Sequence, residues 1–330
     1  MTGLLFAHGF RAFFAAAGVS GLLLVPLWVA GWSGQLRLGT NWPPAAWHGH
    51  EMLFGFVSAA IAGFLLTAVP SWTRHRGFGG APLRLMVGVW LLGRLLVASS
   101  ASWPFAVVAL ADLAFLPVLA AFLAPTLLRE RNRNTPLLLV LLALWSCDLA
   151  FHVGLHREDG EWTEQALRVG IDIVLVLVTI VGGRILPALT TSALRRRGIG
   201  RVARGGGALT SVTVSLMTAV AVIDLIRPAS VFAGAVALAA AVAQALRLAR
   251  WQVIHALRDP LAGVLHLAYA WLPLGLALKA LALLDGATLG NHWLHALTIG
   301  VIATLIVGVM TRVALDRTGR PLQANAQTVL

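Results

Sequence analysis

Long apolar segments recur along the whole chain, and short polar segments separate them. One such segment, residues 52–69, carries no charge and is long enough to cross a bilayer as a helix. The pattern predicts ten spans: Phe10–Trp32, His48–Pro70, Leu83–Ser102, Trp103–Leu128, Pro136–His156, Ala166–Pro187, Ala208–Ile226, Ser230–Leu248, Leu261–Leu284 and Trp293–Arg312. We therefore expect an all-α, polytopic transmembrane helical bundle that forms a single integral membrane domain over residues 1–330.

The composition agrees with this class and excludes several others. Hydrophobic residues make up 58% of the chain and charged residues 12%, as in polytopic membrane proteins. The net charge of +12 would suggest nucleic acid in a soluble protein, but cytoplasmic loops of membrane proteins accumulate Arg. The expected partner is therefore the lipid bilayer and not nucleic acid. Cys147 is the one cysteine, so disulfides and thiolate metal sites are excluded.

The arginines predict the orientation of the spans. With the N-terminus in the cytoplasm, the outer side carries only Arg37, Arg157, Arg168 and Arg227. The inner side carries Arg11, Arg74, Arg76, Arg84, Arg129, Arg131, Arg133, Arg195, Arg196, Arg197, Arg201, Arg204, Arg247, Arg250, Arg258, Arg312, Arg317 and Arg320. Basic residues gather in cytoplasmic loops, so both termini are expected to face the cytoplasm.

Three basic residues fall inside predicted spans, where a charge is costly unless it is paired or functional. Arg94 lies near the middle of the third span and needs a partner, for which Asp112 and Asp172 are candidates. Arg184 is close enough to the inner face to reach it, although an inward contact with a haem propionate stays open. Lys279 is expected to reach the outer headgroups.

Six histidines form three pairs, each at the outer end of a predicted span: His48 and His50, His152 and His156, and His292 and His295. Imidazole is a common ligand of copper, zinc and haem iron. Three pairs at one depth favour a metal or haem site over ordinary interface histidines. The hypothesised core ligands are His50, His152 and His295, with the other three around them. One histidine of the first pair is expected to cap the start of its helix.

Two carboxylates accompany these histidines. Glu51 follows His50 directly, and Asp148 lies one helical turn from His152 on the same face. Asp148 could hold the imidazole in one tautomer, as carboxylates behind metal ligands do, or it could be satisfied by a neighbouring helix. His266, in the inner half of the ninth span, is a candidate for a second haem or metal site.

The sequence resembles the NnrS family almost from end to end. The matching segments are GFRAFF (Gly9–Phe14), WHGHEMLFGF (Trp47–Phe56), AGFLLTAVPSWT (Ala62–Thr73), RNRNTP (Arg131–Pro136), GGRILPALT (Gly182–Thr190), LHLAY (Leu265–Tyr269), HALTIG (His295–Gly300) and MTRVALDRTGR (Met310–Arg320). Ala12 stands where the family usually has proline, and Asp316 stands where it tends to have histidine. The chain also has fewer predicted spans than the family often has.

The resemblance implies haem b and copper as cofactors, a bacterial inner-membrane location and a role in tolerance of nitric oxide stress. It also implies ligand positions at His48, His50, His152, His266 and His295. The small ligand would be nitric oxide, a metal ion or haem.

The resemblance leaves the activity open. A nitric oxide reductase needs an electron input, and the sequence has no soluble cytochrome or flavin domain. A copper or haem transporter is expected to use an interrupted helix, for which Gly182, Gly183 and Pro187 are weak candidates. A purely structural subunit leaves the histidines unexplained. We therefore expect a haem- and copper-binding tolerance protein, with metal or haem handling and nitric oxide reduction as the alternatives.

Overall fold

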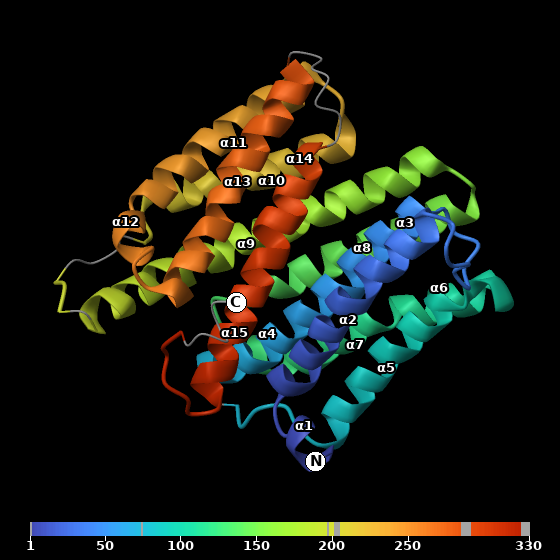
Figure 1. Ribbon diagram of the computed structural model, residues 1–330, viewed down its shortest axis with the longest axis horizontal. Coiled ribbons are helices and arrows are strands. Elements are labelled where there is room, and N and C mark those ends of the chain that lie inside the picture. Colours follow the sequence, from blue (N-terminus) through green and yellow to red (C-terminus); the bar gives the residue numbers. More distant parts are fainter. Residues whose placement is uncertain (1, 74, 197, 201–204, 285–291, 325–330) are drawn as a thin grey trace. The chain divides into compact units, whose positions relative to one another are not determined.

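The structure is a computed structural model that describes residues 2–73, 75–196, 198–200, 205–284 and 292–324. Every regular element in these ranges is a helix (Figure 1). Ten of the described helices are long and apolar enough to cross a membrane. The prediction of an all-helical, polytopic membrane protein is confirmed. Four arginines used to predict the orientation lie outside the described residues: Arg74, Arg197, Arg201 and Arg204.

The candidate spans start and end somewhat differently from the prediction. They are Gly9–Trp32, Pro44–Trp72, Ala81–Ala98, Phe105–Arg129, Leu137–His156, Gly160–Arg196, Ala208–Ile226, Val231–Ala249, Pro260–Leu284 and His292–Arg317. The sixth helix continues beyond Pro187, where the prediction ended it. Proline removes one backbone hydrogen bond of the helix, and membrane helices tolerate this because other groups satisfy the carbonyl that is left free.

The chain forms two compact units, and the first is Met1–Gly170. Its elements are α1 (Thr2–Leu5), α2 (Gly9–Trp32), α3 (Pro44–His50), the π-helix η1 (Glu51–Val57), α4 (Ser58–Trp72), α5 (Ala81–Ala98), the 3-10 helix η2 (Ser100–Ser102), α6 (Phe105–Leu113), α7 (Phe115–Arg129) and α8 (Leu137–His156). Helix α2 packs against η1 and α4, α5 packs against α6, and α7 packs against α8. These packed pairs bring α3, α5, α6 and α8 around one interior.

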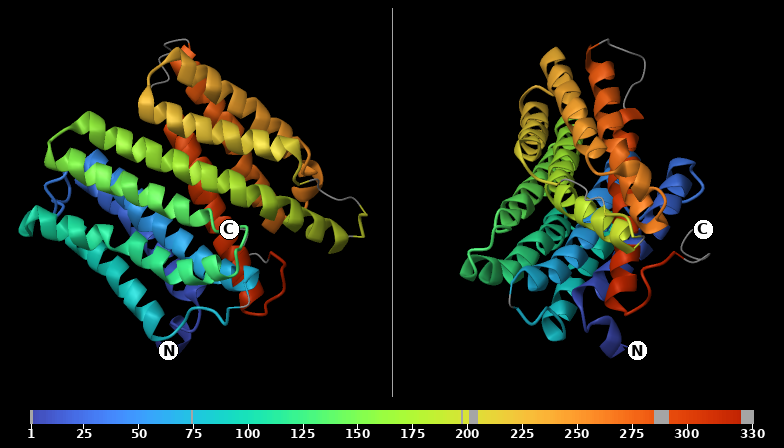
Figure 2. Two further views of the ribbon diagram at one scale, coloured as in Figure 1. Left: turned by 180° about the vertical axis from the view of Figure 1, so that it is seen from behind. Right: turned by 90° about the vertical axis from the view of Figure 1, so that its left-hand side faces the viewer.

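The second unit is Ile171–Leu330, and helix α9 (Gly160–Arg196) runs from the first unit into it. Its other elements are α10 (Ala208–Ile226), α11 (Val231–Ala249), α12 (Val253–Ala256), α13 (Pro260–Leu284), α14 (His292–His295), the π-helix η3 (Ala296–Ala303) and α15 (Thr304–Arg317). Helix α13 packs against α11, η3 and α15, and α10 packs against α11. Figure 2 shows the yellow and orange helices α10, α11 and α13 running side by side.

Polar and apolar side chains are distributed as expected for a protein in lipid. Large apolar side chains face outward: Leu22 is 73% exposed, Leu110 71% and Ile226 69%. Several ionisable side chains are instead buried, including Glu51 and Lys279 at 2% each. Lipid favours apolar side chains on the outside, whereas charges inside membrane segments are usually paired or functional. The buried ionisable groups are therefore where function is to be sought.

Candidate metal site

Four side chains of metal-ligand type converge inside the first unit. We call them the histidine-aspartate cluster, and they are His50, Asp112, Asp148 and His152. They come from α3, α6 and α8, and each is at most 3% exposed. One ligand atom from each residue lies within 4.8 Å of the other three. Imidazole and carboxylate donors together suit a divalent first-row transition metal ion.

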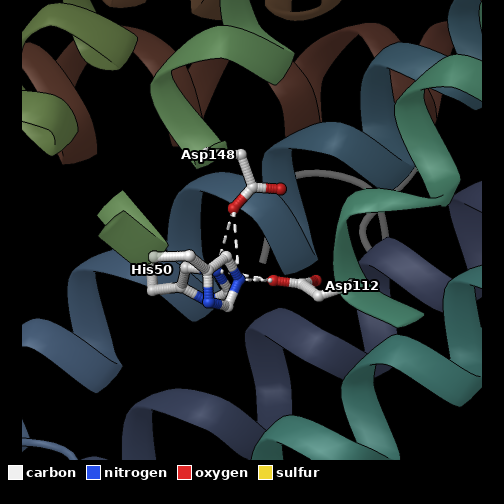
Figure 3. A group of neighbouring side chains, drawn as sticks. His50, Asp112 and Asp148 are labelled. Carbon is white, nitrogen blue, oxygen red and sulfur yellow. Dashed lines mark hydrogen bonds and ion pairs between the residues drawn. The ribbon is translucent and has the colours of Figure 1, made fainter. Parts of the chain in front are cut away.

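Both histidines present Nε2 to the same two carboxylates. His50 Nε2 lies 2.8 Å from Asp112 Oδ2 and 3.2 Å from Asp148 Oδ1, and Figure 3 shows the two aspartates meeting at the His50 ring. His152 Nε2 lies 2.9 Å from Asp112 Oδ2 and 3.8 Å from Asp148 Oδ1. The four donor atoms therefore lie close enough together to bind one ion.

An irregular helix places His50. His50 ends α3, and the π-helix η1 begins at Glu51. The wider turns of a π-helix are often found at functional sites. Here side chains bond to its backbone, because Trp90 Nε1 donates to the Gly55 carbonyl at 3.2 Å and Ser58 Oγ lies 3.3 Å from the same oxygen. These bonds stabilise the irregular segment next to the cluster.

Arg94 of α5 connects the π-helix to the cluster. Its Nη1 donates to Glu51 Oε1 at 2.5 Å, and its Nη2 forms an ion pair with Asp112 Oδ1. Gly93 allows this approach, because a Cβ there would lie 3.1 Å from the Cα of Asp112. Asp112 therefore has one oxygen held by Arg94 and the other facing both histidines.

Glu51 lies behind His50, with Oε1 3.3 Å from His50 Nδ1. A hydrogen bond donated by Nδ1–H leaves Nε2 as the nitrogen that can bind a metal. The buried group contains three carboxylates (Glu51, Asp112 and Asp148) and one guanidinium (Arg94), so its formal charge with neutral histidines is −3 + 1 = −2. A divalent cation would neutralise this charge, which is costly in an apolar interior.

Aromatic rings enclose the two imidazoles. The Trp42 ring lies edge-on to His50 and His152, with centroids 5.1 and 5.6 Å away. The Phe151 ring centroid lies 4.6 Å from that of His50. Trp42 and Phe151 belong to a buried apolar group that also contains Trp47, Val97, Val108 and Ala166. Because the donors meet at a point among packed rings, the cluster fits a single ion and does not fit a haem.

Comparison with known proteins agrees with the motifs. The NnrS protein family model matches residues 4–330. The chain belongs to the NnrS family. The match includes all four residues of the histidine-aspartate cluster, and the family resemblance inferred from the sequence motifs is confirmed. Comparison with curated proteins and with solved structures gave no match.

The structure separates the predicted outer histidines of this NnrS-family chain. His48 is half-buried, and its ring stacks on Trp28 with centroids 4.3 Å apart. Helix α3 begins at Pro44, so the expectation that a histidine caps its start is wrong. His156 is exposed and stacks on Phe105 at 4.9 Å. Neither histidine belongs to the cluster: His48 lies on another face of α3 than His50, and His156 lies one turn beyond His152, at the end of α8.

Two further predicted ligands lie in the second unit. His292 and His295 form the ends of the short helix α14, and both are exposed. His295 directly precedes the π-helix η3, as His50 precedes η1. Their roles as ligands stay predictions.

Sequence reasoning missed one member of the cluster. Asp112 was considered only as a possible partner of Arg94, and that pairing is confirmed. The other candidate partner, Asp172, belongs to the second unit, where it lies 3.9 Å from Lys279 Nζ. The available signal was an aspartate in the apolar segment ALADLAF, which predicts a polar role but not the side chains that it faces.

The remaining predicted residues lie on α9 and α13. Both ring nitrogens of buried His266 are engaged, with Nδ1 donating to the Ala262 carbonyl at 2.9 Å and Nε2 3.1 Å from Thr190 Oγ1. Its role at a second site stays a prediction. Arg184 is exposed on α9. The expectation that Lys279 reaches the headgroups is wrong, because Lys279 is buried and pairs with Asp224 of α10.

Proposed function

We propose that this membrane protein binds a metal ion at the histidine-aspartate cluster and thereby contributes to tolerance of nitric oxide. The observation that carries the proposal is the convergence of four buried ligand atoms within 4.8 Å of one another. Membership of the NnrS family supports the connection with nitric oxide. Copper as the divalent ion agrees with the two imidazole donors. Haem b would need a separate site, for which His266 is the candidate.

Each residue has a distinct task in this proposal. His50 and His152 offer Nε2, and Asp112 and Asp148 offer oxygens that offset the charge of the ion. Arg94 holds Asp112 in place through its second oxygen. A bound ion with an open coordination position supplies a binding point for a small molecule. The enclosing Trp42 and Phe151 rings favour a neutral, lipid-soluble molecule such as nitric oxide over a charged one.

Metal analysis of purified variants tests this proposal. We expect His50→Ala and His152→Ala each to lose one metal equivalent while still inserting into the membrane. His156→Ala is the matched control, because it removes an exposed histidine one turn from His152. His295→Ala tests the third predicted ligand in the same assay. Full copper and haem content in both His50→Ala and His152→Ala would exclude the site.

A second experiment separates binding from turnover and from metal handling. The reduced protein is mixed anaerobically with nitric oxide while an electrode follows the gas and a spectrometer follows the protein. We expect stoichiometric binding with a spectral change that His152→Ala loses. Continued consumption would favour the reductase alternative. Absence of any spectral response would favour copper or haem handling.

We also propose that the chain inserts with both termini in the bacterial cytoplasm, on the evidence of its arginine distribution. Helix α8 runs from Leu137 to His156, so Arg133 precedes its start and Arg157 follows its end. Reporter fusions after these two arginines should therefore lie on opposite sides of the membrane, with Arg157 outside. The reverse result would place the His152 end of α8 at the cytoplasmic face.

A further inference from the structure

The second unit encloses an arginine in the last turn of α11. Arg247 was expected among the arginines of the inner loops, yet it is only 2% exposed. A guanidinium cannot be deprotonated in a protein, so this side chain carries its positive charge into the interior. Its neighbour Arg250, three residues further along, is exposed. The burial is therefore specific to Arg247 and is not a property of this helix end.

The hydrogen bonds of Arg247 involve Nη1 but not Nη2 of its guanidinium. Nη1 donates to the backbone carbonyl of Thr179 at 2.8 Å and lies 3.4 Å from the Tyr269 hydroxyl. The guanidinium carbon lies 5.4 Å from the centre of the Trp251 ring. Nη2 is buried and has no hydrogen-bond acceptor within the described residues. Among the described residues, the protons of Nη2 therefore have no acceptor.

No carboxylate in the described ranges forms an ion pair with Arg247. The ion pairs of the second unit join Lys279 to Asp224 and Asp172, and Arg196 to Asp259. Buried charges are normally paired, because an isolated charge in an apolar interior is strongly disfavoured. Arg247 therefore contrasts with Lys279, whose charge is matched inside the same unit.

The polar residues around Arg247 are already bonded to one another. Tyr269 Oη donates to Gln244 Oε1 at 2.7 Å, and Gln244 Nε2 donates to Thr179 Oγ1 at 3.0 Å. These three side chains are at most 1% exposed. The network holds their positions, and all of its members are neutral. It fixes the surroundings of the guanidinium without neutralising it.

Gly183 of α9 makes room for the guanidinium. A Cβ at this position would overlap with Arg247 Nη2, so only glycine admits the side chain in this position. The sequence GGRILP thus has a packing role at Gly183. The approach brings the unpaired Nη2 against the backbone of α9, with the fully buried Trp251 ring packed against the guanidinium.

We propose that Arg247 is the anchor of an anion-binding site in the second unit. The ligand is a small monovalent anion with oxygen acceptors, such as a carboxylate or an inorganic oxyanion. Guanidinium N–H groups match planar oxygen pairs, which favours this class over a spherical halide. The packed Trp251, Tyr269 and Gly183 favour a small ligand. The same oxygen chemistry could come from a free anion or from a lipid phosphate.

The test uses the purified full-length protein in phosphatidylcholine nanodiscs, titrated with formate, nitrate or chloride. We expect formate or nitrate to raise the unfolding temperature in a saturable way, and chloride to do so less. Arg247→Gln should lose the response, and Arg247→Lys should weaken the apparent affinity about tenfold or more, because a bond to a charged group is lost. Arg250→Gln is the matched control and should retain the response.

A second variant keeps the test decisive if Arg247→Gln does not fold. Gln244 lies three residues before Arg247 on α11, so Gln244→Glu places a carboxylate on the same helix face. This variant should fold, and it should no longer respond to formate or nitrate because Arg247 has an internal partner.

The remaining outcomes distinguish a lipid from a free anion as the ligand, or overturn the proposal of an anion-binding site. Saturable stabilisation by phosphatidylglycerol in the nanodisc, but not by free anions, would identify an anionic lipid headgroup as the ligand. A response that rises linearly, or that is equal in Arg247→Gln and wild type, would show an adventitious ion only and overturn the proposal. An equal response to chloride would overturn the assignment to an oxygen anion. Because the readout involves no metal and no nitric oxide, its failure would leave the metal-site proposal intact.

Discussion

The buried histidine-aspartate cluster of the first unit and the buried Arg247 group of the second unit carry charge of opposite sign. The interior of the first unit holds Glu51, Asp112 and Asp148 against Arg94, which leaves an excess of negative charge. In the second unit, Arg247 lies among neutral side chains, so the group around Arg247 carries an excess of positive charge. Aromatic rings enclose both groups. The comparison teaches that the residual charge of each buried group, and not its residue types alone, indicates which ligand it would accept.

Removing Asp112 should produce the largest effect. In Asp112→Asn, both histidines and Arg94 lose the carboxylate that they share, so we expect loss of the bound metal. Breaking a buried ion pair should also destabilise the protein by about 3–5 kcal/mol. Metal content per protein and unfolding in detergent measure the two effects. Normal metal content in this variant would contradict the assignment of negative charge to metal binding.

Lys279→Met should affect stability as strongly but leave the metal content unchanged. Asp224 and Asp172 lose the cation that they share in the second unit, which should again destabilise the protein by about 3–5 kcal/mol. Unfolding and metal analysis of the same preparation provide the measurement. The double variant Lys279→Met, Asp224→Asn should recover part of the stability. Loss of metal in Lys279→Met would show that the charges of the two units are coupled.

Smaller effects are expected from alanine substitutions at two glycines of α5, Gly93 and Gly88. A Cβ at Gly93 would press on the backbone of Asp112, whereas a Cβ at Gly88 would meet nothing within 4 Å. Gly93→Ala should therefore cost about 1–3 kcal/mol and weaken metal binding, because it pushes α5 away from α6. Gly88→Ala should stabilise the protein by about 0.5–1 kcal/mol. Equal stabilities would contradict a close approach between α5 and α6.

The smallest effect should come from charge on the outside of the first unit. Glu164 is 56% exposed on its side chain and pairs with Arg168 one turn along α9. We expect Glu164→Gln to change the stability by at most about 0.5 kcal/mol, because solvent screens such pairs. Metal content should not change. A loss as large as that of Asp112→Asn would show that net charge, rather than its burial, decides metal binding.

Much of the fold follows from hydropathy alone. Apolar segments long enough to span a bilayer predicted ten helices, and the described residues contain ten. The errors lie at the ends, as at Pro187, because a proline can either end a helix or be accommodated within a membrane helix, and the sequence does not distinguish the two. A further error is the expected exposure of Lys279, whose partner Asp224 lies 55 residues away in the sequence. Hydropathy gives no information on such a distant pair.

The residues of the candidate site were harder to predict from the sequence than the helices. His50, His152 and Asp148 were identified because they occur near the ends of apolar segments, and the structure brings them together. The proximity of these three side chains was therefore predictable, but the point along α8 at which the cluster ends was not. His156 shares a helix end with His152 and is nevertheless exposed. Asp112 required knowledge of which helices are neighbours, and that information lies in the packing of α5, α6 and α8.

The π-helix after His50 has a consequence for insertions and deletions. Each residue of an α-helix turns the chain by about 100°, and the i→i+5 bonds of a π-helix accommodate an additional residue in its turn. Residues 51–57 therefore set the angular phase between α3 and α4. If the segment became α-helical at its present length, His50 would turn by about 100° relative to α4, away from Asp112 and Asp148, whereas deleting one residue at the same time would compensate for this rotation. The length of this segment, as well as its composition, is thus under constraint.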